Sequence, residues 1–279
     1  MFEQDAFNQV EKWTIAYFKI LDDALGYPDQ GFQSTDDVIN IVNGVKSSKT
    51  NEVTPARPGY SSNQTMYATL QSKKSFRYQP GRISGFTFGL RGVTNPETQS
   101  NYIEWGCSNS TDEYMFQLKG PNLSIVRRST IPLPPELLER MGLNERDQTA
   151  APIYVSGLDN TEPLFECTIP RDKWTNDKLD GTGESGYNID ITRVTMYKIE
   201  FCWYGAIGAQ FYAYVHVDND ECRWVLLHRI TIENCIDRPC LENPNFRFKY
   251  LVNVQNTDKM YEPVYLYKYG ASYYIDGGD

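Results

Sequence analysis

Histidine is almost missing from this sequence of 279 residues, which contains only His216 and His228. Histidine is the usual general base near neutral pH and the commonest metal ligand, so catalysis by such a base and multi-histidine metal sites have almost no basis here. Both histidines lie in apolar strand patterns, where we expect structural roles. The sequence also has no G-x-S-x-G motif, no P-loop and no dinucleotide-binding glycine pattern. We therefore expect no enzyme, no catalytic residues and no cofactor.

Basic clusters and long apolar runs are missing as well. The longest basic clusters are the pairs Lys73-Lys74 and Arg127-Arg128, and the net charge is −9. A nucleic-acid-binding protein would usually carry a basic face. No apolar run approaches the roughly 18 residues of a membrane-spanning helix, and the first residues lack the basic flank of a secretory signal. We expect no nucleic-acid partner, no membrane insertion and no secreted precursor.

The cysteines offer little for a metal site or a disulfide framework. There are six, and only Cys235 and Cys240, in the segment CIDRPC, are close enough for a local clip or half a metal site. A second close pair is missing, so we do not expect zinc. Without signs of an oxidising compartment, six free thiols are predicted.

Aromatic residues, in contrast, are abundant at 14%, with 20 tyrosines. From Phe76 onward apolar and polar residues alternate in about ten short segments that are separated by turn signals. Only the segment PPELLERMGLNER between them has a helical pattern. We predict an all-β fold in which residues 76–279 form an antiparallel two-sheet sandwich of the jelly-roll or lectin-like type.

The first 30 residues show a different period. Apolar side chains recur there at steps of three and four residues, and Gly26 and Pro28 follow, which predicts an amphipathic helix over residues 1–30. Its wide apolar face either docks onto the same chain or serves for oligomerisation or anchoring. The oligomerisation and anchoring residues would be Phe7, Val10, Trp13, Tyr17 and Ile20. Residues 31–75 are predicted to be an extended linker or arm.

The most distinctive loop is WTNDKLDGTGESG, residues 174–186. Asp177, Asp180 and Glu184 make it a weak calcium candidate, because carboxylate oxygens are the ligands that calcium prefers. The loop lacks the alternating acids that precede the glycine in an EF-hand. The alternative is a network of turn hydrogen bonds with no metal.

Aromatic side chains in the strand segments are the remaining functional resource. They are Trp105, Trp203, Trp224, Tyr212 and Tyr214. Residues two apart in a strand share one face, so exposed aromatics could stack on sugars. The alternative is that these side chains fill the core of the sandwich.

A glycoside hydrolase needs two carboxylates across one sugar site. Glu104 and Glu200 occur singly in strands, and no E-x-D-x-E run is present. Both are predicted to face solvent, which leaves hydrolysis without a recognisable pair of acids.

Several stretches resemble a domain that recurs in large virion structural proteins of tailed phages that infect marine cyanobacteria. The resemblance covers roughly residues 75–278. The stretches are SFRYQPGRISGFTFGLR, NYIEWGCSNSTDEYMFQLKG, LSIVRRS, WTNDKLDGTGESGYNID, KIEFCWYGAIGAQFYAYV and the closing FRFKYLV with YKYGASYYIDGG. The resemblance implies a non-enzymatic β-sandwich module of a virus particle, and it carries no catalytic residues across.

Three hypotheses follow. The leading one is a structural protein of a phage virion, in the tail, baseplate, fibre or capsid surface, assembled in the host cytoplasm. Its partners would be other virion proteins and copies of itself, with a trimer as the expected oligomer. The alternative is a carbohydrate-binding adhesin module that recognises a glycan of the host surface. A hydrolase of cell-wall glycan is the third.

Overall fold

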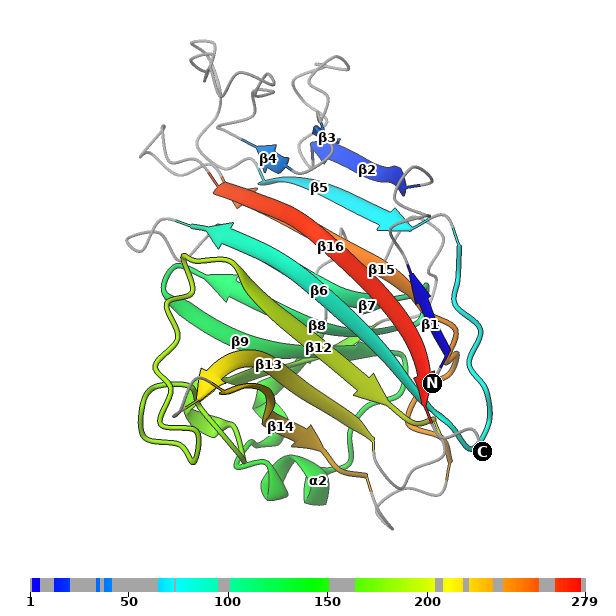
Figure 1. Cartoon of the computed structure of the whole chain (residues 1–279). Coiled ribbons are helices and arrows are strands. Elements are labelled where there is room, and N and C mark those ends of the chain that lie inside the picture. Colours follow the sequence, from blue (N-terminus) through cyan, green and yellow to red (C-terminus); the bar gives the residue numbers. More distant parts are fainter. Residues whose placement is uncertain are drawn as a thin grey trace.

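The structure, a computed structural model of the chain, describes two layers of β-sheet (Figure 1). It describes residues 2–5, 13–20, 34–35, 38–41, 65–72, 74–94, 101–150, 164–203, 208–217, 221–232, 238–255 and 264–276. Between the two sheets lies one hydrophobic core.

The first sheet lies nearer the viewer in Figure 1. Its order is β14 (Glu221–Ile230), β13 (Ala209–Val217), β12 (Thr195–Phe201), β6 (Ile83–Val93), β16 (Val264–Asp276), β4 (Val38–Ile41) and β3 (Ser34–Thr35), with β1 (Phe2–Asp5) paired to β16. All of these pairs are antiparallel. The strand β14 therefore lies at one edge of the sheet.

The second sheet lies behind the first. Its order is β10 (Gln148–Ala150), β11 (Phe165–Pro170), β9 (Asn122–Ser129), β8 (Asp112–Lys119), β7 (Tyr102–Ser108), β15 (Arg247–Gln255), β5 (Thr65–Ser72) and β2 (Trp13–Ile20). These pairs are antiparallel too. The predicted all-β, two-sheet antiparallel sandwich is confirmed.

Helical structure in the described residues is short. The helix α2 (Pro135–Arg140) falls in the segment predicted to be helical, and it buries Leu137 and Leu138. The 3₁₀ turns are η2 (Glu145–Asp147) and η3 (Arg171–Lys173). A proline at the start of α2 suits a position whose amide would have no partner within the helix.

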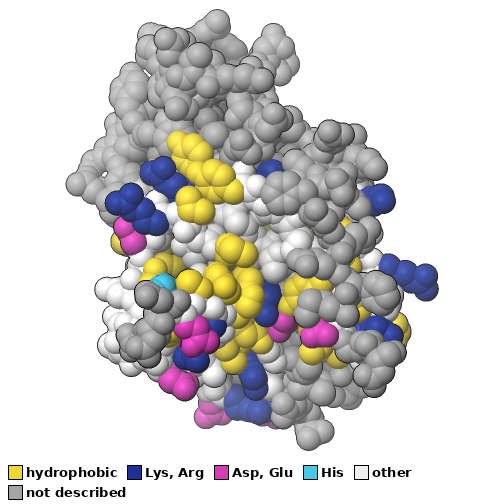
Figure 2. All heavy atoms as spheres, in the orientation of Figure 1, with side chains coloured by type: hydrophobic (Ala, Val, Ile, Leu, Met, Phe, Trp, Pro, Cys, Tyr) yellow, Lys and Arg dark blue, Asp and Glu magenta, His cyan; other side chains and the backbone are white. Residues whose placement is uncertain are grey.

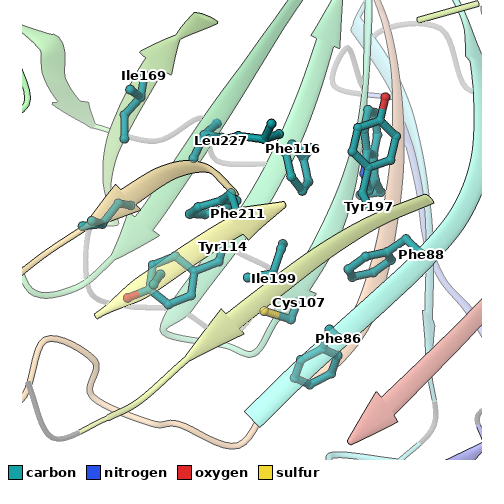
Figure 3. Packing of buried hydrophobic residues seen from close by; sticks show 14 of the residues in the cluster. Phe86, Phe88, Cys107, Tyr114, Phe116, Ile169, Tyr197, Ile199, Phe211 and Leu227 are labelled. Carbon is teal, nitrogen blue, oxygen red and sulfur yellow. The ribbon is translucent and has the colours of Figure 1, made fainter. Parts of the chain in front are cut away.

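Aromatic side chains at alternate positions of the strands fill the core (Figure 3). Phe86 and Phe88 on β6 meet Phe248 on β15 edge-on, with ring centroids 4.9 and 5.4 Å apart. Phe116 on β8 meets Phe211 on β13 at 5.4 Å. These edge-to-face contacts suit the quadrupoles of the rings and join one sheet to the other.

The helix predicted for residues 1–30 is wrong where the structure describes this segment. Trp13, Tyr17 and Ile20 belong to the strand β2, which pairs with β5. Phe7 and Val10 lie outside the described residues. The segment WTIAYFKI is rich in aromatic and β-branched residues, which favour strands as well as fitting a helical stripe. The pairing with β5 decides between the two, because a strand there satisfies the backbone groups along β5.

The linker predicted for residues 31–75 also needs correction. The strands β3, β4 and β5 lie within it, and β5 pairs residue by residue with β15 from Thr65↔Gln255 to Gln71↔Lys249. The sheets therefore include residues that precede the predicted start of the sandwich at residue 76.

The cysteines that the structure describes are free thiols: Cys107, Cys167, Cys202, Cys222 and Cys240. Cys235 lies outside the described residues, so the predicted local clip in CIDRPC stays a prediction. Burial raises the pKa of the Cys167 thiol to about 11, which keeps it protonated and unreactive near neutral pH.

Candidate functional site

Strands at one edge of the first sheet turn aromatic side chains away from the core. Tyr212 and Tyr214 lie two apart on β13, and Trp224 on β14 lies directly opposite Tyr214. Their neighbours Phe211 and Ala213 are fully buried on the core side. Tyr214 exposes 38% of its surface, and its ring meets that of Trp224 with 5.2 Å between the centroids. Tyr214 and Trp224 therefore form an aromatic pair on the outer face of the sheet.

The other predicted platform residues lie elsewhere. Trp105 is 1% exposed and stacks on Phe116 in the core, with 5.6 Å between the ring centroids. Trp203 is half-buried and donates its indole N–H to the carbonyl of Leu241 at 2.8 Å. Of the aromatic residues considered for a sugar platform, Trp105 therefore fills the core, whereas Tyr212, Tyr214 and Trp224 lie on the outer face of the sheet.

Lys198 on β12 braces this aromatic surface. Its Nζ lies 4.1 Å from the ring centroid of Tyr212, 5.0 Å from that of Trp224 and 2.8 Å from Oε1 of Glu200. Glu200 also accepts a hydrogen bond from the hydroxyl of Tyr274, so this acid, predicted to face solvent, is largely covered. Burial and the Glu200 carboxylate raise the pKa of Tyr212, and its phenol stays protonated.

The loop 174–186 attaches to the edge strand β14. The amide of Asn176 donates to the carbonyl of Leu227 at 3.1 Å, and the amide of Asp177 donates to that of Leu226 at 3.2 Å. These bonds use backbone groups that an edge strand would otherwise leave open. The loop therefore lies along the edge of β14.

Asp177 stabilises this loop by hydrogen bonds within it. Its buried carboxylate accepts from the amide of Leu179 at 2.7 Å and from the amide of Ser185 at 2.8 Å. Gly183 lies so close that a Cβ there would be 2.3 Å from Oδ1 of Asp177, so a larger residue would displace this carboxylate. Asp177 is a structural residue of the loop.

The calcium candidates do not converge. Asp180 is exposed and accepts from the amide and hydroxyl of Thr182, at 2.9 and 2.6 Å. Glu184 is exposed, whereas Asp177 is turned inward. Nowhere in the described residues do three or more His, Cys, Asp or Glu side chains form a group that could hold a metal ion. The acids Asp177 and Asp180 instead accept turn hydrogen bonds within this loop, as in the alternative to calcium.

A groove of about 470 Å³ lies between this loop and β14. Its lining consists of Thr175, Asn176, Asp177, Glu184, Ser185, Arg223, Trp224, Val225 and Leu226. The groove thus joins an indole ring to amide, carboxylate, hydroxyl and guanidinium groups. An aromatic surface beside polar groups that fix orientation is a combination that occurs at small-molecule sites. Figure 2 shows this side of the molecule, with apolar side chains exposed on it.

His228 on β14 bonds to the loop through Thr175. It is fully buried, and its Nδ1 lies 3.2 Å from the amide of Thr175, which donates to it. This bond requires the tautomer with the proton on Nε2. Burial lowers the pKa of His228 to about 4. The structural role expected for this residue agrees with these contacts.

We therefore predict that acid weakens the chain through His228. The unfolded state takes up a proton as the pH falls below about 6.5, whereas the folded state does so only near 4, so stability is lost over this interval. His228→Asn keeps an acceptor for Thr175 but does not titrate. Urea unfolding between pH 7 and pH 4 should show the wild type losing more stability than H228N. Equal losses in both would contradict the lowered pKa of the buried His228.

A second polar cluster, the charge network, lies on the face of the second sheet opposite the core. Its centre is Arg128 on β9, which binds Glu104 through Nη2 at 2.6 Å, Glu113 through Nη1 at 2.9 Å and Glu166 through Nε at 2.5 Å. Lys249 on β15 pairs with Glu113. Burial alone would raise the pKa of Glu113, but Lys249 and Arg128 outweigh it and hold that pKa below its ordinary value.

The charge network corrects the prediction for Glu104, which is fully buried rather than solvent-facing. Glu104 and Glu113 are two acids at one site, but both are held by ion pairs, and neither lines the groove beside β14. The other members of the charge network, Glu113, Arg128, Glu166 and Lys249, were not predicted from the sequence. Their signal is charge of both signs at outward positions of strands that lie side by side in the sheet.

No protein-family model matches this chain, and no curated protein matches it. Among solved structures, it is similar to a lectin from Bauhinia forficata in complex with GalNAc, at 7% identity and a TM-score of 0.40, covering 100% of this chain and 98% of the lectin. It is also similar to the exoplasmic/lumenal domain of VIP36 in its Ca²⁺/Man3GlcNAc-bound form, at 8% identity and 0.40, covering 96% and 85%. For alginate lyase AlgAT5 of polysaccharide lyase family 7 the values are 12% and 0.38, covering 91% and 86%. At these values the similarity assigns no site or activity to this chain.

Over the part of the chain that the structure describes, no helix is long and apolar enough to cross a membrane.

Proposed function

We propose that this domain is a carbohydrate-binding module and that the groove beside Trp224 is its binding site. The observation that carries the proposal is the position of Trp224, which is half-buried beside the exposed Tyr214 and lines a groove whose other lining is mostly polar. Sugars present apolar C–H faces and a rim of hydroxyls, so they need this combination of an aromatic surface and hydrogen-bonding groups.

In this proposal Trp224 stacks on a sugar ring while Asn176, Glu184 and Arg223 bond its hydroxyls. These three side chains are exposed, and they come from both walls of the groove. The Lys198 ammonium lies over the indole ring, and the Tyr214 ring meets the indole edge-on. The site binds and orients, and the proposal includes no catalytic step.

The test is a panel of purified glycans, including those of bacterial envelopes, screened against the wild type and Trp224→Ala. We expect at least a tenfold loss of affinity for every bound glycan in W224A, because its stacking surface is gone. Trp224→Tyr is the matched control, since it keeps an aromatic ring and should retain most of the affinity. Thermal unfolding should be similar in all three proteins. A glycan that binds W224A as tightly as the wild type would place its site elsewhere.

The role as a virion structural protein remains a prediction that rests on the sequence resemblance over residues 75–278. A glycan site on such a protein would make it an adhesin of the particle. Light scattering on the purified chain tests the predicted self-association. A trimer would support it, and a monomer at all concentrations would remove that part of the hypothesis.

A further inference from the structure

One cross-strand row of residues runs from the groove over the outer face of the first sheet. Trp224 lies opposite Tyr214, Tyr214 opposite Met196, Met196 opposite Gly89, and Gly89 opposite Gly270. Residues directly opposite one another on antiparallel strands share one face. The five strands β14, β13, β12, β6 and β16 therefore contribute one residue each to this row, which we name the aromatic–glycine row.

The aromatic–glycine row carries large side chains at one end and none at the other. Tyr214 and Met196 expose 38% and 43% of their surface. Gly89 and Gly270 carry no side chains, and a Cβ at Gly89 would meet only the backbone of Gly270 at the ordinary contact distances of 3.6 and 3.8 Å, so we call this the open end of the row. Strands lie about 4.8 Å apart, so the four spacings from Trp224 to Gly270 span about 19 Å.

A second row, of polar side chains, runs beside it. Ser272, Thr87, Lys198 and Tyr212 lie opposite one another on β16, β6, β12 and β13. Thr87 and Ser272 share a hydrogen bond between their hydroxyls, and both are partly exposed. Hydroxyl groups therefore border the open end, and the Lys198 ammonium borders its middle.

We propose that the aromatic–glycine row binds an extended carbohydrate chain of about four sugar residues, one for each strand spacing. This inference rests on the proposed function and adds the class of ligand, an internal segment of a linear polysaccharide rather than a single terminal sugar. The strand spacing is close to the length of one sugar residue in a chain. The polar row lies where an interface with a protein would have its apolar core, whereas it supplies partners for sugar hydroxyls.

Chain length provides the test, with oligosaccharides of one to six residues cut from the glycan that binds in a Trp224-dependent way. Calorimetry should show the Kd falling at least tenfold from one to four residues and changing little from four to six. Gly89→Phe adds a ring at the open end of the row, where its Cβ makes only ordinary contacts with the backbone of Gly270. G89F should therefore bind the tetrasaccharide no more tightly than the disaccharide, with disaccharide affinity unchanged.

Arg229→Phe is the matched control, because Arg229 is an exposed residue of β14 that lies opposite Gln210, outside the aromatic–glycine row. R229F should bind all lengths like the wild type. Affinity that is independent of length, together with wild-type binding by G89F, would overturn the extended site and leave the Trp224 groove intact. A panel with no Trp224-dependent ligand would instead overturn the proposed function and this inference with it.

Discussion

Replacing Arg128 by methionine should lower the free energy of unfolding by about 3–5 kcal/mol, because it leaves buried negative charges without their positive partner. The guanidinium is fully buried and forms ion pairs with Glu104, Glu113 and Glu166. Glu104 keeps only the amide of Gln117, at 2.7 Å, among the side-chain partners assigned to it, whereas Glu113 keeps Lys249. Methionine fills the volume of the stem but leaves Glu104 and Glu166 without the Arg128 cation.

Urea unfolding at pH 7 measures this effect. Arg223→Met is the matched control, because Arg223 is exposed on β14 and its replacement should change stability by less than about 0.5 kcal/mol. A loss below about 1 kcal/mol in R128M would mean that the charge network contributes little net stability, as some buried ion pairs do.

Trp105→Ala should lower the free energy of unfolding by about 3–5 kcal/mol through the cavity that it leaves in the core. The indole is 1% exposed and packs against Phe116 and Tyr197, with ring centroids 5.6 and 5.0 Å away. Its Nε1 is buried and has no hydrogen-bond partner. Desolvation of an unpaired N–H is unfavourable, so part of the benefit of the indole is already offset.

Trp105→Phe separates these two contributions. It removes the unpaired N–H while keeping an aromatic ring, so its loss should be less than half of that in W105A. Thermal and urea unfolding of both variants give the comparison. A loss in W105F as large as in W105A would show that the N–H is stabilised in the folded state.

Apart from β10, in which none of the three residues is buried, the strands from β6 onward could be predicted from alternation, because each has one face in the core. Trp13, Tyr17 and Ile20 could not be assigned in this way, since their spacing suits a helix and their residue types suit a strand. Only the pairing with β5 separates the two, and that contact joins residues about 50 positions apart.

The candidate site was predictable in its parts and not in its assembly. The loop 174–186 is visible in the sequence, but Asp177 has the same residue type whether it binds calcium or backbone amides. Trp105 and Trp224 both lie in alternating segments, and the sequence does not show which phase faces the core. Registers such as Tyr214↔Trp224 depend on the sheet as a whole, so the aromatic pair emerges only in three dimensions.

The indole N–H resonances of ¹⁵N-labelled protein test the central claim most directly. Titration with a glycan that binds in the panel should shift the resonance of Trp224, identified by its absence from W224Y. The resonances of Trp105 and Trp174, which are buried in the core, should stay in place. Saturable binding that leaves the Trp224 resonance unmoved would contradict a glycan site at this groove.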